Sequence, residues 1–368
     1  MKILIACDKF KGSLDATQVC QNIATGIHKK YPYAQTQSLP LADGGDGTLS
    51  MLEKVLDVER IKVPSVDPLN RPIQSYYLSN GKTAYIELAT TSGFELLHSQ
   101  ELDVMNTNTF GTGLLLKDAL QNGHHEIILA LGGSCTNDVG LGILEAMGYI
   151  FKDKNNAKIS PNGGSLIEIE SIVVPSFQPS FQLTILHDVE NLLFGKEGAA
   201  FTFAAQKGAS DLEIKILDDG MQHIAKILKT KTGKSIQKLK GGGAAGGIAA
   251  GLYGFLKNVV LQNGFEYLSK LNQLEEQIKN CDVMITGEGQ LDTSSFNGKV
   301  VGKIVELCQK HQKFLKLFVG RNALSNKLNY KNTEIYSLED VAKSKEDSMQ
   351  YVKEYLTQIA SSLELKME

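Results

Sequence analysis

The stretch Ile127-Ile128-Leu129-Ala130-Leu131-Gly132-Gly133-Ser134-Cys135-Thr136-Asn137-Asp138 joins a short apolar run to a cluster of glycine and polar residues. An apolar run of this length that stops at glycine is typical of a strand buried on both faces of an α/β sheet. In such sheets, ligands bind beyond the carboxyl ends of the strands. The stretch therefore predicts a buried strand that ends in a ligand-binding loop.

The same arrangement recurs along the chain, with a polar or glycine-containing cluster after each of the apolar runs Ile3–Cys7, Leu183–Leu186, Val283–Ile285 and Phe314–Val319. These clusters offer backbone N–H groups, lysines, carboxylates and amides, which suit phosphate or an anionic small molecule. We therefore expect the clusters to converge on one site.

The composition is that of a globular protein without a dominant charge. The chain has 368 residues and a net charge of -3, so about two domains are expected and no global field favours nucleic acid or an anionic membrane. The five cysteines form no C-x-x-C pair, which argues against a zinc or dithiol site. With neither a signal peptide nor a membrane-length apolar segment, the protein is expected to be cytoplasmic.

The chain reads as two α/β domains. The first domain begins with a strand at Ile3–Cys7. A loop follows, and then a helix that is capped by Ser13 and ends near Pro32. The strand–loop–helix pattern then stops at a group of prolines and a predicted β-hairpin of Pro72–Leu78 and Lys82–Leu88. The pattern returns to strand, loop and helix near Cys281. We expect a discontinuous domain of residues 1–66 and 282–368, with residues 67–281 inserted as the second α/β domain.

Three loops carry carboxylates or amides that suit a hydroxylated substrate. Residues 43–48 hold two aspartates that could orient hydroxyls or hold Mg²⁺ through water, and an ordinary Asp/Gly turn is the alternative. Residues 136–138 are all suitable N-caps for a helix over 139–147. Because a helix has only one N-cap, the other polar side chains favour a ligand-binding role for this loop. Asp188 is a candidate general base, whereas its neighbour His187 is more typical of a strand end.

Three further loops suit phosphate. Residues 8–13 precede a helix N-terminus, which attracts anions, and Lys11 adds charge; a solvated loop is the alternative. Residues 241–247 contain G-x-G-x-x-G, but the polar residues 235–240 before them are no buried strand, so a nicotinamide site is disfavoured. The run fits a close-packed helix start or a loop under a phosphate. Residues 287–292 offer Glu288 and Asp292, and no Walker A sequence occurs in the chain.

Eight motifs, taken in order along the chain, resemble those of the type I glycerate kinases. They are Asp8-x-Phe10-Lys11-Gly12-Ser13-Leu14, Ala42-Asp43-Gly44-Gly45-x-Gly47-Thr48, Gly111-Thr112-Gly113, Gly132-Gly133-Ser134-x-Thr136-Asn137-Asp138, Asp188-Val189-x-Asn191, Gln206-Lys207-Gly208-Ala209, Gly243-Ala244-Ala245-Gly246-Gly247 and Thr286-Gly287-Glu288-Gly289-x-x-Asp292. The resemblance implies an ATP-dependent kinase of D-glycerate, in bacteria usually giving 2-phosphoglycerate. It also implies a Rossmann-like three-layer α/β domain with a second α/β domain.

Residue chemistry and the resemblance together give each loop an expected role. Asp188 would accept or orient the proton of the substrate hydroxyl, and Lys11 and Lys207 would neutralise phosphate charge. Mg²⁺ would bridge the ATP oxygens, with Glu288 and Asp292 as candidate ligands. The expected substrate contacts are Asp8, Ser13, Asp43, Asp46, Asn137 and Asn191. The expected phosphate contacts are Gly132, Gly133, Ser134, Thr136, Gly243, Gly246, Gly247, Gly287 and Lys299.

The sequence departs from the family pattern at Cys7, Lys9, Leu192, Ala204-Ala205 and Gln290. The family usually has arginine at the last of these, and its loss removes a bidentate anion contact. A kinase of another small hydroxy or sugar acid is therefore one alternative. A non-enzymatic sensor of a phosphorylated acid is another, although the many carboxylates beside glycine turns argue against a pure anion sensor.

Overall fold

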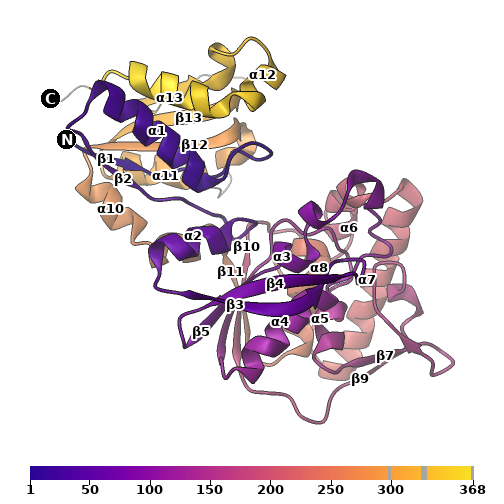
Figure 1. Ribbon diagram of the computed structural model, residues 1–368. Coiled ribbons are helices and arrows are strands. Elements are labelled where there is room, and N and C mark those ends of the chain that lie inside the picture. The colour runs from indigo at the N-terminus through magenta and orange to yellow at the C-terminus, as the bar shows by residue number, and fades with distance from the viewer. Residues whose placement is uncertain (297–299, 325–329, 366–368) are drawn as a thin grey trace. The chain divides into compact units, whose positions relative to one another are not determined.

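The computed structural model describes residues 1–296, 300–324 and 330–365. By its contacts the chain divides into two compact units (Figure 1): unit 1 is Met1–Asp43 with Phe265–Glu368, and unit 2 is Gly44–Gly264. The sequence expectation places the boundaries after residues 66 and 281. In the structure, residues 44–66 belong to unit 2 because β3 (Glu59–Val66) pairs with β4 (Pro72–Ser79). Helix α10 (Leu274–Asn280) packs against the first strand and belongs to unit 1.

The core of unit 1 is a five-stranded parallel sheet in the order β14-β13-β12-β1-β2. The strands are β1 (Lys2–Ile5), β2 (Gln35–Ser38), β12 (Val283–Leu291), β13 (Phe314–Asn322) and β14 (Thr333–Ser337). Strand β1 is central, with Ile3 opposite Val283 and Lys2 opposite Gln35. The three apolar runs predicted as strands in this unit are confirmed.

Helices cover both faces of this sheet (Figure 1). Ile3, Ile5 and Ile285 share one cluster with α1 (Ala16–Lys30) and α13 (Val352–Ser362), whereas the alternating Leu4 and Met284 are buried outside that cluster. Helices α10 and α11 (Val300–Lys310) contact the sheet as well. The remaining helices are α9 (Gly264–Leu271), which begins at the unit boundary, and α12 (Lys345–Gln350). The expected three-layer α/β arrangement is thus confirmed.

Helix α1 begins later than expected. Its N-cap is Asp15, whose side chain accepts from Gln18 N at 2.8 Å within a capping box, so the prediction of Ser13 as the cap was wrong. Ser13 N instead donates to Phe10 O at 2.9 Å, which closes a turn and holds Ser13 outside the helix.

Unit 2 contains a six-stranded mixed sheet in the order β11-β10-β6-β5-β4-β3. Strands β5 (Thr83–Glu87), β6 (Glu126–Ala130), β10 (Gln182–His187) and β11 (Val259–Asn263) are parallel, while β3 and β4 join antiparallel. The predicted hairpin of β4 and β5 is confirmed, with Leu78 opposite Tyr85. A small antiparallel sheet consists of β7 (Ile150–Lys152), β8 (Lys158–Ile159) and β9 (Ser171–Val173).

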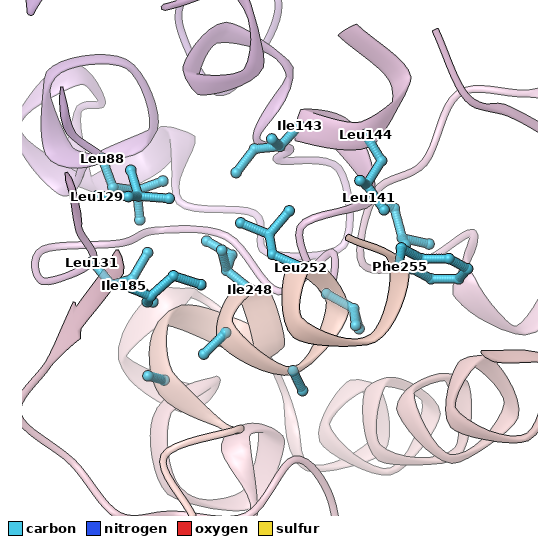
Figure 2. Packing of buried hydrophobic residues seen from close by; sticks show 14 of the residues in the cluster. Leu88, Leu129, Leu131, Leu141, Ile143, Leu144, Ile185, Ile248, Leu252 and Phe255 are labelled. Carbon is cyan, nitrogen blue, oxygen red and sulfur yellow. The ribbon is translucent and has the colours of Figure 1, made fainter. Parts of the chain in front are cut away.

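The core of unit 2 lies between its large sheet and helices (Figure 2). Leu129 and Ile185 of the sheet belong to one buried cluster with Ile248 and Leu252 of α8 (Ala244–Phe255) and Ile143 of α5 (Leu141–Ala146). The other helices are α2 (Thr48–Val55), α3 (Ala89–Ser92), α4 (Phe110–Gln121), α6 (Ala199–Phe203) and α7 (Asp211–Thr232).

Short 3-10 helices occupy Phe94–Leu96, Ser99–Glu101, Leu166–Glu168, Ala205–Lys207, Thr293–Phe296 and Leu338–Asp340. All five cysteines are free and buried, as expected of small core residues. Within the part of the chain that the structure describes, no helix combines the length and apolarity needed to span a bilayer.

Candidate functional site

In unit 2, the loops after several parallel strands meet at the carboxyl edge of the sheet. Leu131 N donates to Leu186 O at 3.1 Å, which joins the ends of β6 and β10, and Gly132 N donates to Gly44 O at 3.2 Å. A Cβ on Gly132 would lie 2.2 Å from Gly45 Cα, so this approach requires glycine. The predicted clusters at residues 44–48, 132–138 and 187–188 therefore lie at one edge.

Asp138 is a buried carboxylate that holds the loop after β6. Its Oδ2 accepts from Thr109 N at 2.8 Å, Thr109 Oγ1 at 2.7 Å and Gly142 N at 3.1 Å, and its Oδ1 accepts from Gly140 N at 3.0 Å. Burial raises the pKa of this carboxyl, and the bonds from Thr109, Gly140 and Gly142 oppose the rise. Asp138 thereby ties the loop to the starts of α4 and α5.

The helix after this loop starts later than the predicted range of 139–147. Helix α5 begins at Leu141, and its N-cap is Gly140, so none of residues 136–138 is the cap. Val139 adopts a left-handed conformation with φ 57°, which no helical residue can have, and this delays the helix. Gly148, with φ 96°, follows the C-cap Met147, a position that favours glycine.

Asn137 is fully buried, and neither Oδ1 nor Nδ2 of its side chain has a hydrogen-bond partner among the described residues. Leaving a buried polar group unsatisfied costs roughly 1–3 kcal/mol. Such groups are rare in native proteins and call for an explanation. An amide can both donate to and accept from a ligand, so this side chain suits a carboxylate or a hydroxyl.

The start of α8 packs directly against Asn137. Ala245, Gly246 and Gly247 have left-handed φ values of 51°, 70° and 90°, and Val139 N donates to Gly246 O at 3.1 Å. A Cβ on Gly246 would lie 2.2 Å from Thr136 O and 2.6 Å from Asn137 Cα. The glycine run is thus a close-packed helix start, which was one of the two structures expected for it. Non-glycine residues in this conformation are strained, and such strain clusters at functional sites.

Lys207 lies beneath the same loop. Its side chain is buried, and Nζ donates to Thr136 O at 2.6 Å. Burial lowers the pKa of the Lys207 ammonium to about 8, and the nearby Cys135 and Asp138 oppose the shift. Ser134 and Thr136 complete the loop, since Thr136 N donates to Ser134 Oγ at 3.1 Å.

Asp188 is exposed and follows directly after β10. The preceding His187 has Nδ1 2.8 Å from Val189 O, and burial lowers the pKa of its imidazole. Asn191 Nδ2 donates to Glu197 O at 2.7 Å, and Gly243 N donates to Asn191 O at 2.9 Å. Asn191 therefore links the loop that carries Asp188 to the glycine run before α8.

In unit 1, three carboxylates lie at the carboxyl edge of the sheet. Asp8 follows β1, Asp43 follows β2 and Glu288 lies in β12, and Asp8 N donates to Gly287 O at 3.0 Å. Burial and the charges of Asp43 and Glu288 raise the pKa of Asp8 to about 8, against the opposing effect of Lys9. This unit therefore gathers its own acidic group from the predicted site residues.

The loop that carries Lys11 packs against the end of β12, because a Cβ on Gly289 would lie 3.4 Å from Lys11 N. The Lys11 side chain is exposed. Asp292 Oδ2 accepts from Gln290 Nε2 at 3.1 Å, and a Cβ on Gly287 would lie 2.3 Å from Phe318 O. The predicted phosphate contact Lys299 lies outside the described residues.

No group of three or more His, Cys, Asp or Glu side chains in residues 1–296, 300–324 and 330–365 is arranged to hold a metal ion. Mg²⁺, however, is usually bound by one or two carboxylates together with substrate phosphates and water. Glu288 and Asp292 supply two carboxylates close together in sequence at the end of β12. Carboxylate oxygens are the kind of protein donor that Mg²⁺ takes when nucleotide phosphates and water complete its coordination.

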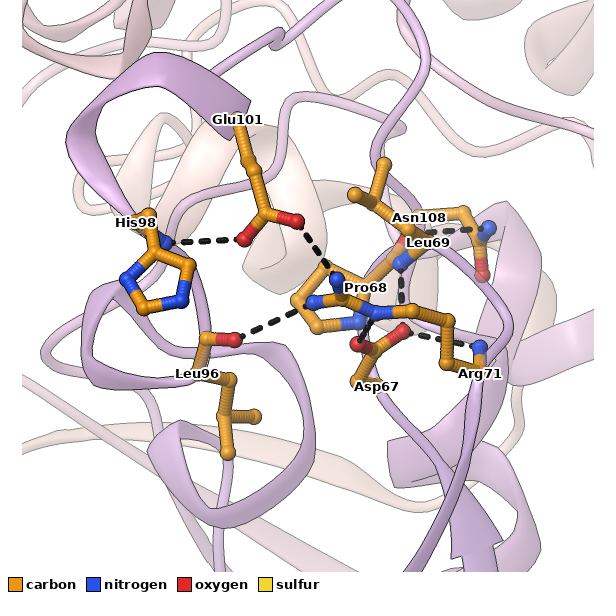
Figure 3. Close-up of polar contacts among 8 residues, drawn as sticks. All are labelled: Asp67, Pro68, Leu69, Arg71, Leu96, His98, Glu101 and Asn108. Atoms are coloured by element: carbon orange, nitrogen blue, oxygen red, sulfur yellow. Dashed lines mark hydrogen bonds and ion pairs between the residues drawn. The ribbon is translucent and has the colours of Figure 1, made fainter.

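The exposed guanidinium of Arg71 is engaged by two carboxylates and a backbone carbonyl (Figure 3). Its guanidinium forms ion pairs with Asp67 and with Glu101, and it donates to Leu96 O at 3.3 Å. Asp67 Oδ1 also accepts from Leu69 N at 2.9 Å. Pro68 O accepts from Asn108 N at 3.0 Å, so the network fixes the segment that leads to Thr109. Arg71 therefore supports the site from outside it.

Sequence reasoning missed two carboxylates that organise unit 2. Asp138 was considered as a helix cap or a ligand contact but not as the residue that holds the loop, and Glu87, which accepts from Gly47 N and Leu49 N, was not considered. A carboxylate that closes the apolar run Thr83–Leu88 was the available signal for Glu87.

The fold and the loops define an α/β protein that presents polar, glycine-rich loops at the carboxyl ends of parallel strands. The sequence model described as the glycerate kinase family matches residues 3–367. The chain belongs to the glycerate kinase family, which confirms the resemblance stated from the motifs.

Individual relatives agree with this assignment. Glycerate 2-kinase of Escherichia coli K12 is 38% identical over 319 residues, which cover 85% of this chain and 83% of that protein. Glycerate kinase of Halalkalibacterium halodurans is 38% identical over 302 residues, covering 81% and 79%. A crystal structure from Salmonella typhimurium LT2, named provisionally as glycerate kinase 2, superimposes with a TM-score of 0.79 at 32% identity and covers 98% and 96% of the two chains.

Proposed function

We propose that this protein phosphorylates D-glycerate with ATP and forms 2-phosphoglycerate. The observation that carries the proposal is the buried, unpartnered amide of Asn137 at the carboxyl edge of the unit 2 sheet. A small hydroxy acid presents hydroxyls and a carboxylate, which together use both the donor and the acceptor of an amide. The glycerate kinases that resemble the chain over most of its length support the choice of substrate.

In the proposed reaction, the substrate hydroxyl attacks the terminal phosphorus of ATP, the bond from that phosphorus to the bridging oxygen breaks, and ADP leaves. Phosphoryl transfer depends mainly on positioning and charge neutralisation. The exposed carboxylate of Asp188 accepts or orients the hydroxyl proton, and Asn137 and Asp46 hold the other polar groups of the substrate. Lys11, as expected from the sequence, is proposed to neutralise phosphate charge. Lys207 was expected to neutralise phosphate charge; because its Nζ donates to Thr136 O, we propose that it positions the loop.

The other substrate contacts that we propose are Asp8, Ser13, Asp43 and Asn191. Backbone groups at Gly132, Gly133, Gly243, Gly246, Gly247 and Gly287, with Ser134, Thr136 and Lys299, are the proposed phosphate contacts. Mg²⁺ would be held by Glu288 and Asp292 and would neutralise charge on the phosphate oxygens.

The variant Asn137→Leu tests the proposal because leucine has nearly the shape of asparagine but no polar atoms. Replacement of an unpaired buried amide should leave the melting temperature unchanged or raise it. If the amide binds substrate, kcat/KM for D-glycerate should fall by at least about 100-fold in a coupled assay of ADP release. Near-normal turnover in the variant would remove Asn137 from the site.

The same assay distinguishes the alternatives. A panel of hydroxy acids and sugar acids would show preference for another acceptor if Gln290, in place of the family's usual arginine, alters the choice of substrate. Thermal stabilisation by glycerate or phosphoglycerate without any release of ADP would favour a sensor.

A further inference from the structure

Glu87, the last residue of β5, connects the large sheet of unit 2 to the start of α2. Its side chain is buried, with 6% of its surface exposed. Oε1 accepts from Gly47 N at 3.0 Å, and Oε2 accepts from Leu49 N at 2.9 Å. Helix α2 has Gly47 as its N-cap and therefore no side-chain cap of its own. A carboxylate from another element supplies the missing acceptors.

This contact determines what the start of α2 can bind. A helix N-terminus carries partial positive charge and free N–H groups, which commonly receive a phosphate. Here the Glu87 carboxylate accepts hydrogen bonds from two of these N–H groups and places its negative charge at the helix N-terminus. Glu87 therefore disfavours a phosphate at this helix, although the preceding loop is rich in glycine.

The same contact fixes the loop around Asp46. On one side of Asp46, Gly45 O accepts from Thr48 Oγ1 at 2.6 Å, and on the other, Gly47 is held by Glu87. A Cβ on Gly133 would lie 3.6 Å from Asp46 Oδ1, so the Asp46 carboxylate lies beside the loop after β6. A carboxylate in this position accepts hydrogen bonds and suits a substrate hydroxyl rather than a phosphate.

We propose that Glu87 is a positioning residue that assigns the loop at residues 44–48 to the acid substrate. It holds Asp46 in place to accept a substrate hydroxyl, and it closes the N-terminus of α2 to the phosphates of the nucleotide. This inference rests on the proposed function, because the hydroxyl belongs to glycerate.

Glu87→Gln tests the anchoring without any substrate. The amide keeps one acceptor but loses the charge, and its NH₂ group meets a backbone donor. Amide hydrogen exchange of a peptide covering residues 44–52 should be accelerated about tenfold. Glu126→Gln is the matched control, because Glu126 lies at the opposite edge of the same sheet and pairs on the surface with Lys82. Exchange as slow in Glu87→Gln as in this control would overturn the proposal.

Steady-state kinetics test the assignment of the loop. Glu87→Gln should raise KM for glycerate about tenfold while KM for ATP stays within about twofold of the wild-type value. A lower melting temperature with both KM values unchanged would make Glu87 a helix cap only and would overturn the proposal. A parallel rise in KM for ATP would do the same. If the wild-type protein does not phosphorylate glycerate, the proposed function is wrong, and so is the proposal that Asp46 accepts a glycerate hydroxyl. Hydrogen exchange still decides in that case whether Glu87 holds the loop.

Discussion

Asn137 and Asp138 are adjacent in sequence, both are fully buried, and their bonding is opposite. Asp138 accepts four hydrogen bonds from residues of its own unit, whereas the Asn137 amide has no partner among the described residues. A buried polar group without a partner is costly, so the Asn137 amide calls for an explanation that a bound ligand would supply. Asp138 therefore holds the loop in its conformation, whereas Asn137 is the residue that the loop offers to a ligand.

The role of Asp188 can be tested by Asp188→Asn, which removes a proton acceptor with little change in shape. If Asp188 accepts the proton of the glycerate hydroxyl, kcat should fall by about 10²–10⁴-fold while the fold is kept. Asp57→Asn is the control, because Asp57 is an exposed aspartate between α2 and β3. Comparable kcat values for the two variants would exclude Asp188 as the base.

Lys207 gives a prediction on the pH dependence of stability. Its pKa is lowered to about 8 in the folded protein, so between about pH 8 and the unfolded value near 10.4 the unfolded chain binds more protons. The free energy of unfolding should therefore rise with pH across this window, by up to ~1.4 kcal/mol per pH unit from this group.

Lys207→Met lacks this titration and is of similar length. Denaturant unfolding of the two proteins at several pH values should show a difference in stability that shifts in favour of the wild-type protein as pH rises from 8 to 10. Parallel stability curves would mean that the ammonium is not desolvated in the folded state.

At the scale of elements, the start of α8 depends on close contact between two backbones. Gly246 is left-handed, and a Cβ there would lie 2.2 Å from Thr136 O. Gly233, at the end of α7, is also left-handed with φ 74°, but a Cβ there would meet nothing within 4 Å. Both Gly→Ala changes carry the conformational cost of about 1 kcal/mol, and only the first adds a clash.

Gly246→Ala should therefore destabilise the protein by at least ~2 kcal/mol more than Gly233→Ala in chemical denaturation. The extra loss should be accompanied by reduced activity, because the clash moves the backbone at Asn137. Equal destabilisation by the two changes would contradict the close contact.

Five buried strands could be predicted from the sequence because their apolar runs were long enough to identify them. The helix starts were less accurate. Ser13 was an acceptable cap by type, but the turn at Phe10 moved the start of α1 to Asp15. The helix expected from residue 139 began at Leu141 because Val139 is left-handed. In both cases a local backbone conformation prevented the helix from starting at the predicted residue. The residue types alone do not show which of the two structures will form.

The organising carboxylates escaped prediction for a different reason. Glu87 bonds to residues 38 and 40 positions earlier, and Asp138 bonds to Thr109, 29 positions away. Such partners are set by the packing of a sheet, which a single sequence does not specify. The loops that carry Asn137 and Asp188 were predictable because their polar residues adjoin strong strand signals, and the loop that carries Asp46 was predictable from its aspartates and glycines. Their roles in binding and catalysis remain predictions.

At the scale of the whole molecule, the predicted loops divide between two sheets. Strands β1, β12 and β13 belong to unit 1, and β6 and β10 belong to unit 2. The sequence indicated five buried strands but not which of them pair, because all five have similar apolar patterns. The unit boundaries depend on the same pairing, so residues 44–66 were expected in the first domain, whereas the structure has them in unit 2.

The chain belongs to the glycerate kinase family, and the central proposal is that it phosphorylates D-glycerate at the 2-hydroxyl. The most direct measurement is phosphorus NMR of the product made from D-glycerate, ATP and Mg²⁺, without decoupling from protons. Transfer to the 2-hydroxyl places phosphorus next to a single C–H proton, so the account predicts a new phosphomonoester doublet that appears together with ADP. A triplet from a phosphate on the terminal CH₂, or no new phosphomonoester at all, would contradict it.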